Sequence, residues 1–113
     1  MFVLAESGAT KGDWRLLDVN RRVARVLTPG TNVSTMDAGT IRDIIRGAAS
    51  RLIPEGTRVD AVYFYTAGVL TPELTASLEE DVRRIFSVEE VEVQTDLVAA
   101  ARAACCFGLV TVK

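Results

Sequence analysis

The apolar segment Ala61–Tyr65 constrains the fold more than any other part of the chain. It is continuously apolar, whereas a strand with one solvent-exposed face alternates apolar and polar side chains. Strands of this kind are usually covered on both faces, which implies parallel pairing inside an α/β sheet between helix layers. Because the whole chain has 113 residues, it has room for one such domain.

Three further strands are expected before this segment, because short β-rich runs are separated by polar links. We predict these strands at residues 1–5, 14–19 and 23–28, with a turn over 6–13 and a hairpin link at 20–22. Pro29-Gly30 ends the third strand. After the Ala61–Tyr65 segment, Val91–Thr95 alternates as a half-exposed fifth strand does.

The helices are recognised by apolar residues spaced three and four apart. The first has its apolar face at Ile41, Ile44, Ile45, Ala48 and Leu52. Ser34 or Thr35 is expected to cap it, with Asp37 in the first turn and an end at 54–56. Thr71-Pro72-Glu73 begins the second helix, whose buried stripe is Leu74, Leu78, Val82, Ile85 and Phe86.

A third, alanine-rich helix is expected from Asp96 to about Cys106. The predicted order is therefore βββαβαβα, an α/β fold with a mixed five-stranded sheet and flanking helices. Residues 109–112 have the composition of a further strand that is cut off at the end of the chain. The glycine patterns of P-loop and dinucleotide-binding proteins are missing.

Composition and charge exclude several classes of function. Thirteen basic and fifteen acidic residues give a net charge of −2, so nothing indicates a nucleic-acid or membrane partner. The absence of histidine excludes Ser-His-Asp and Cys-His nucleophile activation. Adjacent Cys105 and Cys106 suit neither a disulfide framework nor a zinc site. With no apolar run long enough for a signal peptide or a membrane span, we expect a cytoplasmic protein.

Three polar segments follow predicted strands, where ligands bind in such sheets. The turn at 6–12 has backbone N–H groups and Lys11 for a phosphate, although a tight hairpin needs small residues for conformational reasons alone. The segment 29–32 offers an amide to ligand hydroxyls, or is simply a turn before a helix cap. Asp96 is either a general base or an N-cap.

Taken together with a further turn at residues 65–68, these segments resemble motifs of a known family. The four segments are Glu6-Ser7-Gly8-Ala9-Thr10-Lys11-Gly12-Asp13-Trp14, Thr28-Pro29-Gly30-Thr31-Asn32, Tyr65-Thr66-Ala67-Gly68 and Thr95-Asp96-Leu97-Val98-Ala99-Ala100-Ala101-Arg102. They are similar to the D-S/G-G-x-T-K-T-D-W, T-x-G-x-N, Y-G-A-G and N/S-D-x-x-A-A-x-R patterns of the BadF/BadG/BcrA/BcrD-type ATPases. That family includes N-acetylglucosamine kinases and belongs to the sugar kinase/Hsp70/actin superfamily.

The resemblance implies a ribonuclease-H-like lobe, one of two that hold ATP and magnesium in the cleft between them. It implies that the first loop contacts the ATP phosphates and the magnesium shell through Glu6, Ser7, Gly8, Ala9, Thr10 and Lys11. Glu6 would be the residue beside the metal. Asn32 and the Ala67-Gly68 turn would lie toward a sugar substrate, and Asp96 would deprotonate its attacking hydroxyl.

The sequence departs from the family pattern in three respects. The usual Asp is Glu6, the second Thr is Gly12, and the chain stops at Lys113 before the family's second phosphate loop. Residues 1–106 are therefore interpreted as the N-terminal actin-like lobe and 107–113 as a truncated start of the second. We expect no kinase activity from this lobe alone, because it lacks the adenosine site. The alternative is a non-catalytic, homo-oligomerising module derived from such a kinase, with 109–112 as its pairing strand.

Overall fold

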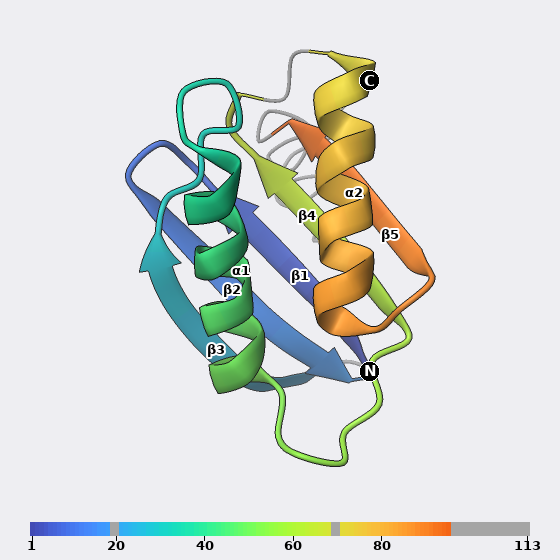
Figure 1. Cartoon of the computed structure of the whole chain (residues 1–113). Helices are drawn as coiled ribbons and strands as arrows, with labels where there is room; N and C mark the ends of the chain where they lie inside the picture. The colour runs from blue at the N-terminus through green and yellow to red at the C-terminus, as the bar shows by residue number, and fades with distance from the viewer. Residues whose placement is uncertain (19–20, 69–70, 96–113) are drawn as a thin grey trace, which may run out of the picture.

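The computed structural model describes residues 1–18, 21–68 and 71–95. Within them, five strands and two helices follow one another in the predicted order βββαβαβ. The elements are β1 Phe2–Ser7, β2 Lys11–Asp18, β3 Arg21–Pro29, α1 Ala38–Leu52, β4 Ala61–Thr66, α2 Pro72–Phe86 and β5 Glu90–Thr95 (Figure 1). The predicted third helix and the 109–112 strand lie outside the described residues.

The strands form one mixed sheet in the order β3-β2-β1-β4-β5. β1, β2 and β3 are an antiparallel meander, while β4 pairs parallel with both β1 and β5. The mixed α/β sheet predicted from the sequence is therefore confirmed. The parallel register also matters for function, because it aligns Ser7, Thr66 and Thr95 at the carboxyl ends of three strands.

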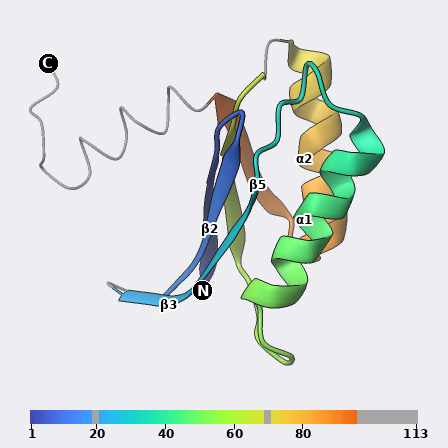
Figure 2. The same cartoon turned by 90° about the vertical axis from the view of Figure 1, so that its left-hand side faces the viewer.

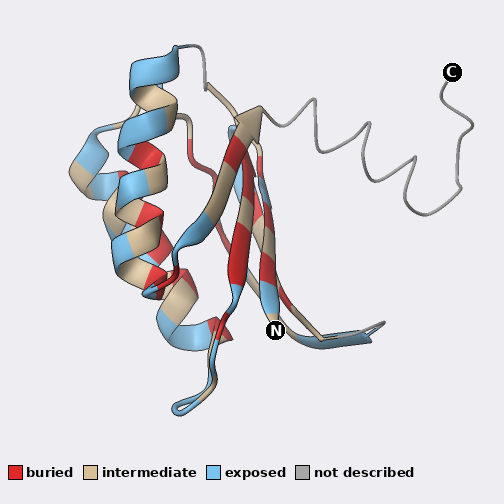
Figure 3. Ribbon diagram, turned by 90° about the vertical axis from the view of Figure 1, so that its right-hand side faces the viewer, coloured by how far each residue is buried: buried red, intermediate tan, exposed pale blue. Residues whose placement is uncertain are grey.

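Both described helices pack on the same face of the sheet, as the two side views show (Figures 2 and 3). Each helix buries one stripe of apolar side chains against the strands, which is the arrangement that its three-and-four spacing predicts. The buried residues are Ile41, Ile45, Ala48 and Leu52 of α1, and Leu78, Val82 and Phe86 of α2. Within the described residues, helices cover one face of β4, although its continuously apolar sequence predicted cover on both.

Two local predictions need correction. The first turn spans only 8–10, not 6–13, because the Gly8 N–H donates to the Lys11 carbonyl at 3.0 Å and closes a tight hairpin. The α1 N-cap is Asp37, whose carboxylate accepts from the Thr40 N–H at 3.1 Å. The predicted caps Ser34 and Thr35 lie too early in the chain, because α1 begins at Ala38 and the residue that directly precedes it is Asp37. Thr71 caps α2 as predicted.

Candidate functional site

Three segments that follow strands meet at one end of the sheet (Figure 1). The 8–10 turn follows β1, the loop from Gly30 follows β3, and the 67–68 turn follows β4. The Ala67 N–H donates to the Ser7 carbonyl at 2.9 Å, and Asn32 forms a parallel bridge with Ala67. The predicted phosphate segment and the predicted sugar segments are therefore neighbours, although 55 residues of the sequence lie between Lys11 and Ala67.

The 8–10 turn presents polar groups at the surface. Ala9 and Thr10 are exposed, and within the described residues their N–H groups have no partner. Lys11 and Glu6 flank the turn and are also exposed. Free backbone N–H groups beside an ammonium are the donors that a phosphate group needs. Gly8 closes the turn, and Ala9, Thr10 and Lys11 carry groups that could donate hydrogen bonds; that these groups bind a phosphate stays a prediction.

Ser7 lies differently from the rest of the predicted phosphate segment. Its side chain points toward the helices, in the same direction as Val3 and Ala5, and is 1% exposed. The Ser7 hydroxyl accepts from the Thr31 N–H at 2.8 Å and from the Thr31 hydroxyl at 2.9 Å. Its hydroxyl is thus part of the buried framework beneath the turn.

Position 12 also faces the core. A Cβ on Gly12 would lie 2.7 Å from the Thr28 Oγ1 atom and 3.2 Å from the Trp14 Nε1 atom, which are hydrogen-bonded to each other at 3.0 Å. The threonine of the family pattern would therefore meet this buried pair at its first side-chain atom. The difference from the family pattern at Gly12 therefore changes the packing of the core beneath β2 and β3.

Asn32, Ala67 and Gly68 form the second half of the candidate site. The Val33 N–H donates to the Ala67 carbonyl at 3.1 Å, and the Ser34 hydroxyl donates to the Gly68 carbonyl at 2.6 Å. Gly68 has φ +82°, and a Cβ there would collide with the Asn32 side-chain oxygen. That oxygen accepts from the Ser34 N–H at 3.1 Å, so the Asn32 NH₂ group is the part left for a ligand hydroxyl.

The acidic residues of the described chain offer little for a metal ion. No group of three His, Cys, Asp or Glu residues is close enough within the described ranges to hold a metal. Glu6 is exposed at the end of β1 and supplies a single carboxylate. This fits a magnesium ion held mainly by phosphate and water, which is the usual way in which magnesium binds nucleotide enzymes. Asp96, the predicted base, lies outside the described residues.

Asp13 belongs to the same motif, but its carboxylate is held in ion pairs. The Arg25 guanidinium donates to both Asp13 oxygens, at 3.0 and 2.8 Å, and Arg15 donates at 3.1 Å. The hydrogen bonds from Arg25 lower the pKa of Asp13 below 3.8, with Arg15 adding to the effect and burial opposing it. The Asp13 carboxylate therefore links three strand positions on the face away from the helices.

Removing this charge is expected to make stability less dependent on acid pH. A folded-state pKa below the unfolded value adds stability above pH ~4, and that stability is lost as the pH falls through the folded pKa. Asp13→Asn should cost about 1 kcal/mol of unfolding free energy at pH 7, with the difference from wild type shrinking toward pH ~3. Urea unfolding at both pH values measures it. Asp43→Asn, at a carboxylate that is 78% exposed, is the control. If the difference in unfolding free energy between Asp13→Asn and wild type were the same at both pH values, the lowered pKa would not be what stabilises the fold.

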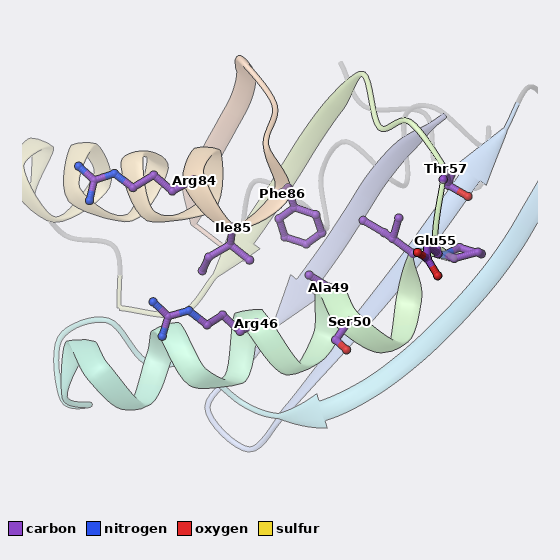
Figure 4. A pocket seen from close by; sticks show the side chains of 11 residues that line it. Arg46, Ala49, Ser50, Glu55, Thr57, Arg84, Ile85 and Phe86 are labelled. Carbon is purple, nitrogen blue, oxygen red and sulfur yellow. The ribbon is translucent and has the colours of Figure 1, made fainter.

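The described residues line two notable cavities. The larger, about 580 Å³, opens between the C-terminal ends of α1 and α2, with Arg46 and Arg84 on opposite walls and Phe86 at its floor (Figure 4). It lies at the end of the sheet opposite the three segments. The smaller, about 380 Å³, lies between the start of α2 and the end of β5, beside Thr95.

Among the described helices, none is long and apolar enough to cross a membrane.

Comparison with known proteins shows a fold similar to part of two solved structures. No family model matches the sequence, and no curated protein does. Among solved structures, a Porphyromonas gingivalis protein described as a putative N-acetylglucosamine kinase is 30% identical, covers 94% of the chain and superposes with a TM-score of 0.74. A ROK hexokinase from Thermus thermophilus shares the fold at 17% identity, with 91% coverage and a TM-score of 0.60. The chain spans 38% of the length of each.

Proposed function

Because this chain is similar in fold to the N-terminal lobe of a sugar kinase, we propose that it forms one wall of a cleft in which ATP phosphorylates a sugar hydroxyl. The proposed substrate is N-acetylglucosamine or a related amino sugar. One observation carries the proposal: the predicted phosphate turn and the predicted sugar segments, distant in sequence, meet at the carboxyl end of β1 and β4. Transfer of phosphate requires donor and acceptor side by side.

The turn after β1 is the proposed phosphate site. The N–H groups of the exposed residues Ala9 and Thr10 and the ammonium of Lys11 would donate to phosphate oxygens, and Glu6 would face the magnesium shell. When bound, ATP supplies the phosphoryl group that is transferred and magnesium offsets its negative charge. This lobe contributes positioning and positive charge, which are the main requirements of such a reaction.

The segments after β3 and β4 are the proposed sugar site. The Asn32 NH₂ group, oriented by the hydrogen bond between its side-chain oxygen and Ser34, would donate to a sugar hydroxyl. The sugar could approach the backbone of the Ala67-Gly68 turn closely, because Gly68 has no side chain that would lie over Asn32. Asp96 directly follows Thr95, the last residue of β5, and is proposed as the base that accepts the proton of the attacking hydroxyl.

A second wall is part of this proposal. The chain spans 38% of the length of each of the two similar structures, and we propose that the adenosine site belongs to the other lobe. The purified 113-residue chain should therefore transfer no radiolabelled phosphate from magnesium ATP to N-acetylglucosamine above the blank. The same lobe joined to a complete second lobe should turn over. Turnover by the chain alone would refute the two-wall requirement, and a joined protein that phosphorylates no sugar would refute the kinase assignment.

A further inference from the structure

Three consecutive residues, Gly30, Thr31 and Asn32, each contact a different part of the candidate site. Gly30 packs against the backbone of the 8–10 turn: a Cβ there would lie 2.6 Å from the Ala9 carbonyl carbon and 2.7 Å from the Thr10 nitrogen, and against the Gly8 carbonyl oxygen. Real Cβ atoms essentially never approach so closely. The backbone of Gly30 therefore packs directly against the backbone of the proposed phosphate turn.

Thr31 joins the ends of the adjacent strands β1 and β4. It is 0% exposed, and its hydroxyl lies 2.9 Å from the Ser7 hydroxyl of β1 and 2.7 Å from the Thr66 hydroxyl of β4. Its backbone takes part as well, because its N–H donates to Ser7 and its carbonyl accepts from Thr66 at 2.8 Å. Buried hydrogen bonds of this kind hold their groups in one arrangement, since an unpaired partner is costly.

Asn32 completes the path to the proposed sugar segment through its bridge to Ala67 and the contact between its side-chain oxygen and Gly68. We propose that Gly30–Asn32 makes the 8–10 turn and the 67–68 turn one positional unit, with Thr31 as the positioning residue. The inference rests on the proposed function for its consequence: a phosphate group bound at the first turn and an amino sugar bound at the second strengthen each other's binding.

The positional part is tested on the full chain by backbone amide NMR and hydrogen exchange, without ligand. Thr31→Val keeps the side-chain shape but removes the hydroxyl, so amides of both turns should shift and exchange faster. Thr31→Ser should restore both turns. Thr28→Val is the matched control, because it removes another buried hydroxyl, which is bonded to Trp14 and to the Pro29 carbonyl and has no hydrogen bond to the described residues of either turn. A response in Thr31→Val at one turn only, or the same response in Thr28→Val, would overturn the proposal.

Gly30→Ala provides an independent variant if Thr31→Val does not fold. Its Cβ displaces the 8–10 turn directly, so the decisive readout is the distant 67–68 turn, whose amides should also shift. Gly8→Ala is its control, because a Cβ at position 8 meets no atom within 4 Å. Gly30→Ala with an unchanged 67–68 turn would overturn the coupling.

The ligand part is measured by calorimetry with magnesium pyrophosphate and N-acetylglucosamine. Each should bind wild type about fivefold or more tightly when the other is present, as coupled sites typically do. This increase in affinity should fall below about twofold in Thr31→Val and should be about as large as in wild type in Thr31→Ser. Independent binding in wild type would overturn the coupling. If wild type bound neither probe, the proposed function and the coupled binding would fail together, while the amide experiment would still decide whether the turns form one unit.

Discussion

Replacing Trp14 by alanine is expected to lower the free energy of unfolding by about 3–5 kcal/mol, a large part of what a domain of this size has. Trp14 is 0% exposed and lies at the centre of the core. Its ring lies 4.9 Å from that of Phe64 in β4 and 6.1 Å from that of Phe86 in α2, centroid to centroid. Urea unfolding followed by circular dichroism measures the loss.

Two further variants distinguish the loss of the Trp14 hydrogen bond and of buried volume from the loss of an exposed apolar side chain. Trp14→Phe keeps most of the apolar volume but removes the indole N–H that donates to the Thr28 hydroxyl, so we expect a loss of about 1–2 kcal/mol. Leu27→Ala removes a large apolar side chain that is 56% exposed, and should change stability by less than about 0.5 kcal/mol. If Trp14→Ala were as mild as Leu27→Ala, the tryptophan would not be the centre of the core.

The elements whose signals are local could be predicted from the sequence. Thr71-Pro72-Glu73 marks a helix start through a hydroxyl cap, a fixed proline φ angle and an early carboxylate, and α2 begins there. The apolar run Ala61–Tyr65 predicted a parallel strand, and β4 pairs parallel on both sides. Such signals act over a few residues, so the neighbours in space are not needed to interpret them.

The orientation of the site residues depends on the rest of the fold and was predicted less well. Ser7 belongs to the phosphate motif, yet strand alternation places its side chain with Val3 and Ala5, toward the helices. The period of two in β1 could have shown this, had the strand been extended to Ser7. The same alternation in β2 places Gly12 with Trp14.

The sequence around Gly30 and Thr31 contains no local pattern that predicts their contacts. Gly30 stands before a helix in sequence, where glycine commonly ends a strand or forms a turn. Its actual constraint is the backbone of residues 8–10, about twenty residues earlier. The burial of Thr31 likewise depends on β1 and β4 being adjacent in the sheet. Candidate ligand groups could therefore be predicted from motifs, whereas the residues that position them required the three-dimensional arrangement.

Replacing Asp96 by asparagine, in the lobe joined to a complete second lobe, is expected to reduce kcat for sugar phosphorylation by about 10²–10⁴-fold. Asparagine has nearly the same shape but cannot accept the proton of the attacking hydroxyl. The KM values for sugar and ATP should change much less, because the lost interaction belongs to the transition state. Steady-state kinetics of the joined protein measure both quantities. Asp43→Asn, the same change at an exposed residue of α1, should leave them unaltered.

This substitution also separates the two interpretations of Asp96, general base and helix cap. Asparagine caps helices about as well as aspartate, so a residue that only capped a helix would tolerate the change with turnover and unfolding free energy close to wild type. A general base would lose turnover while stability stayed the same. Full turnover in Asp96→Asn would therefore remove Asp96 from the mechanism. Lost turnover with unchanged stability would identify Asp96, the residue that follows Thr95 in the sequence, as the proton acceptor.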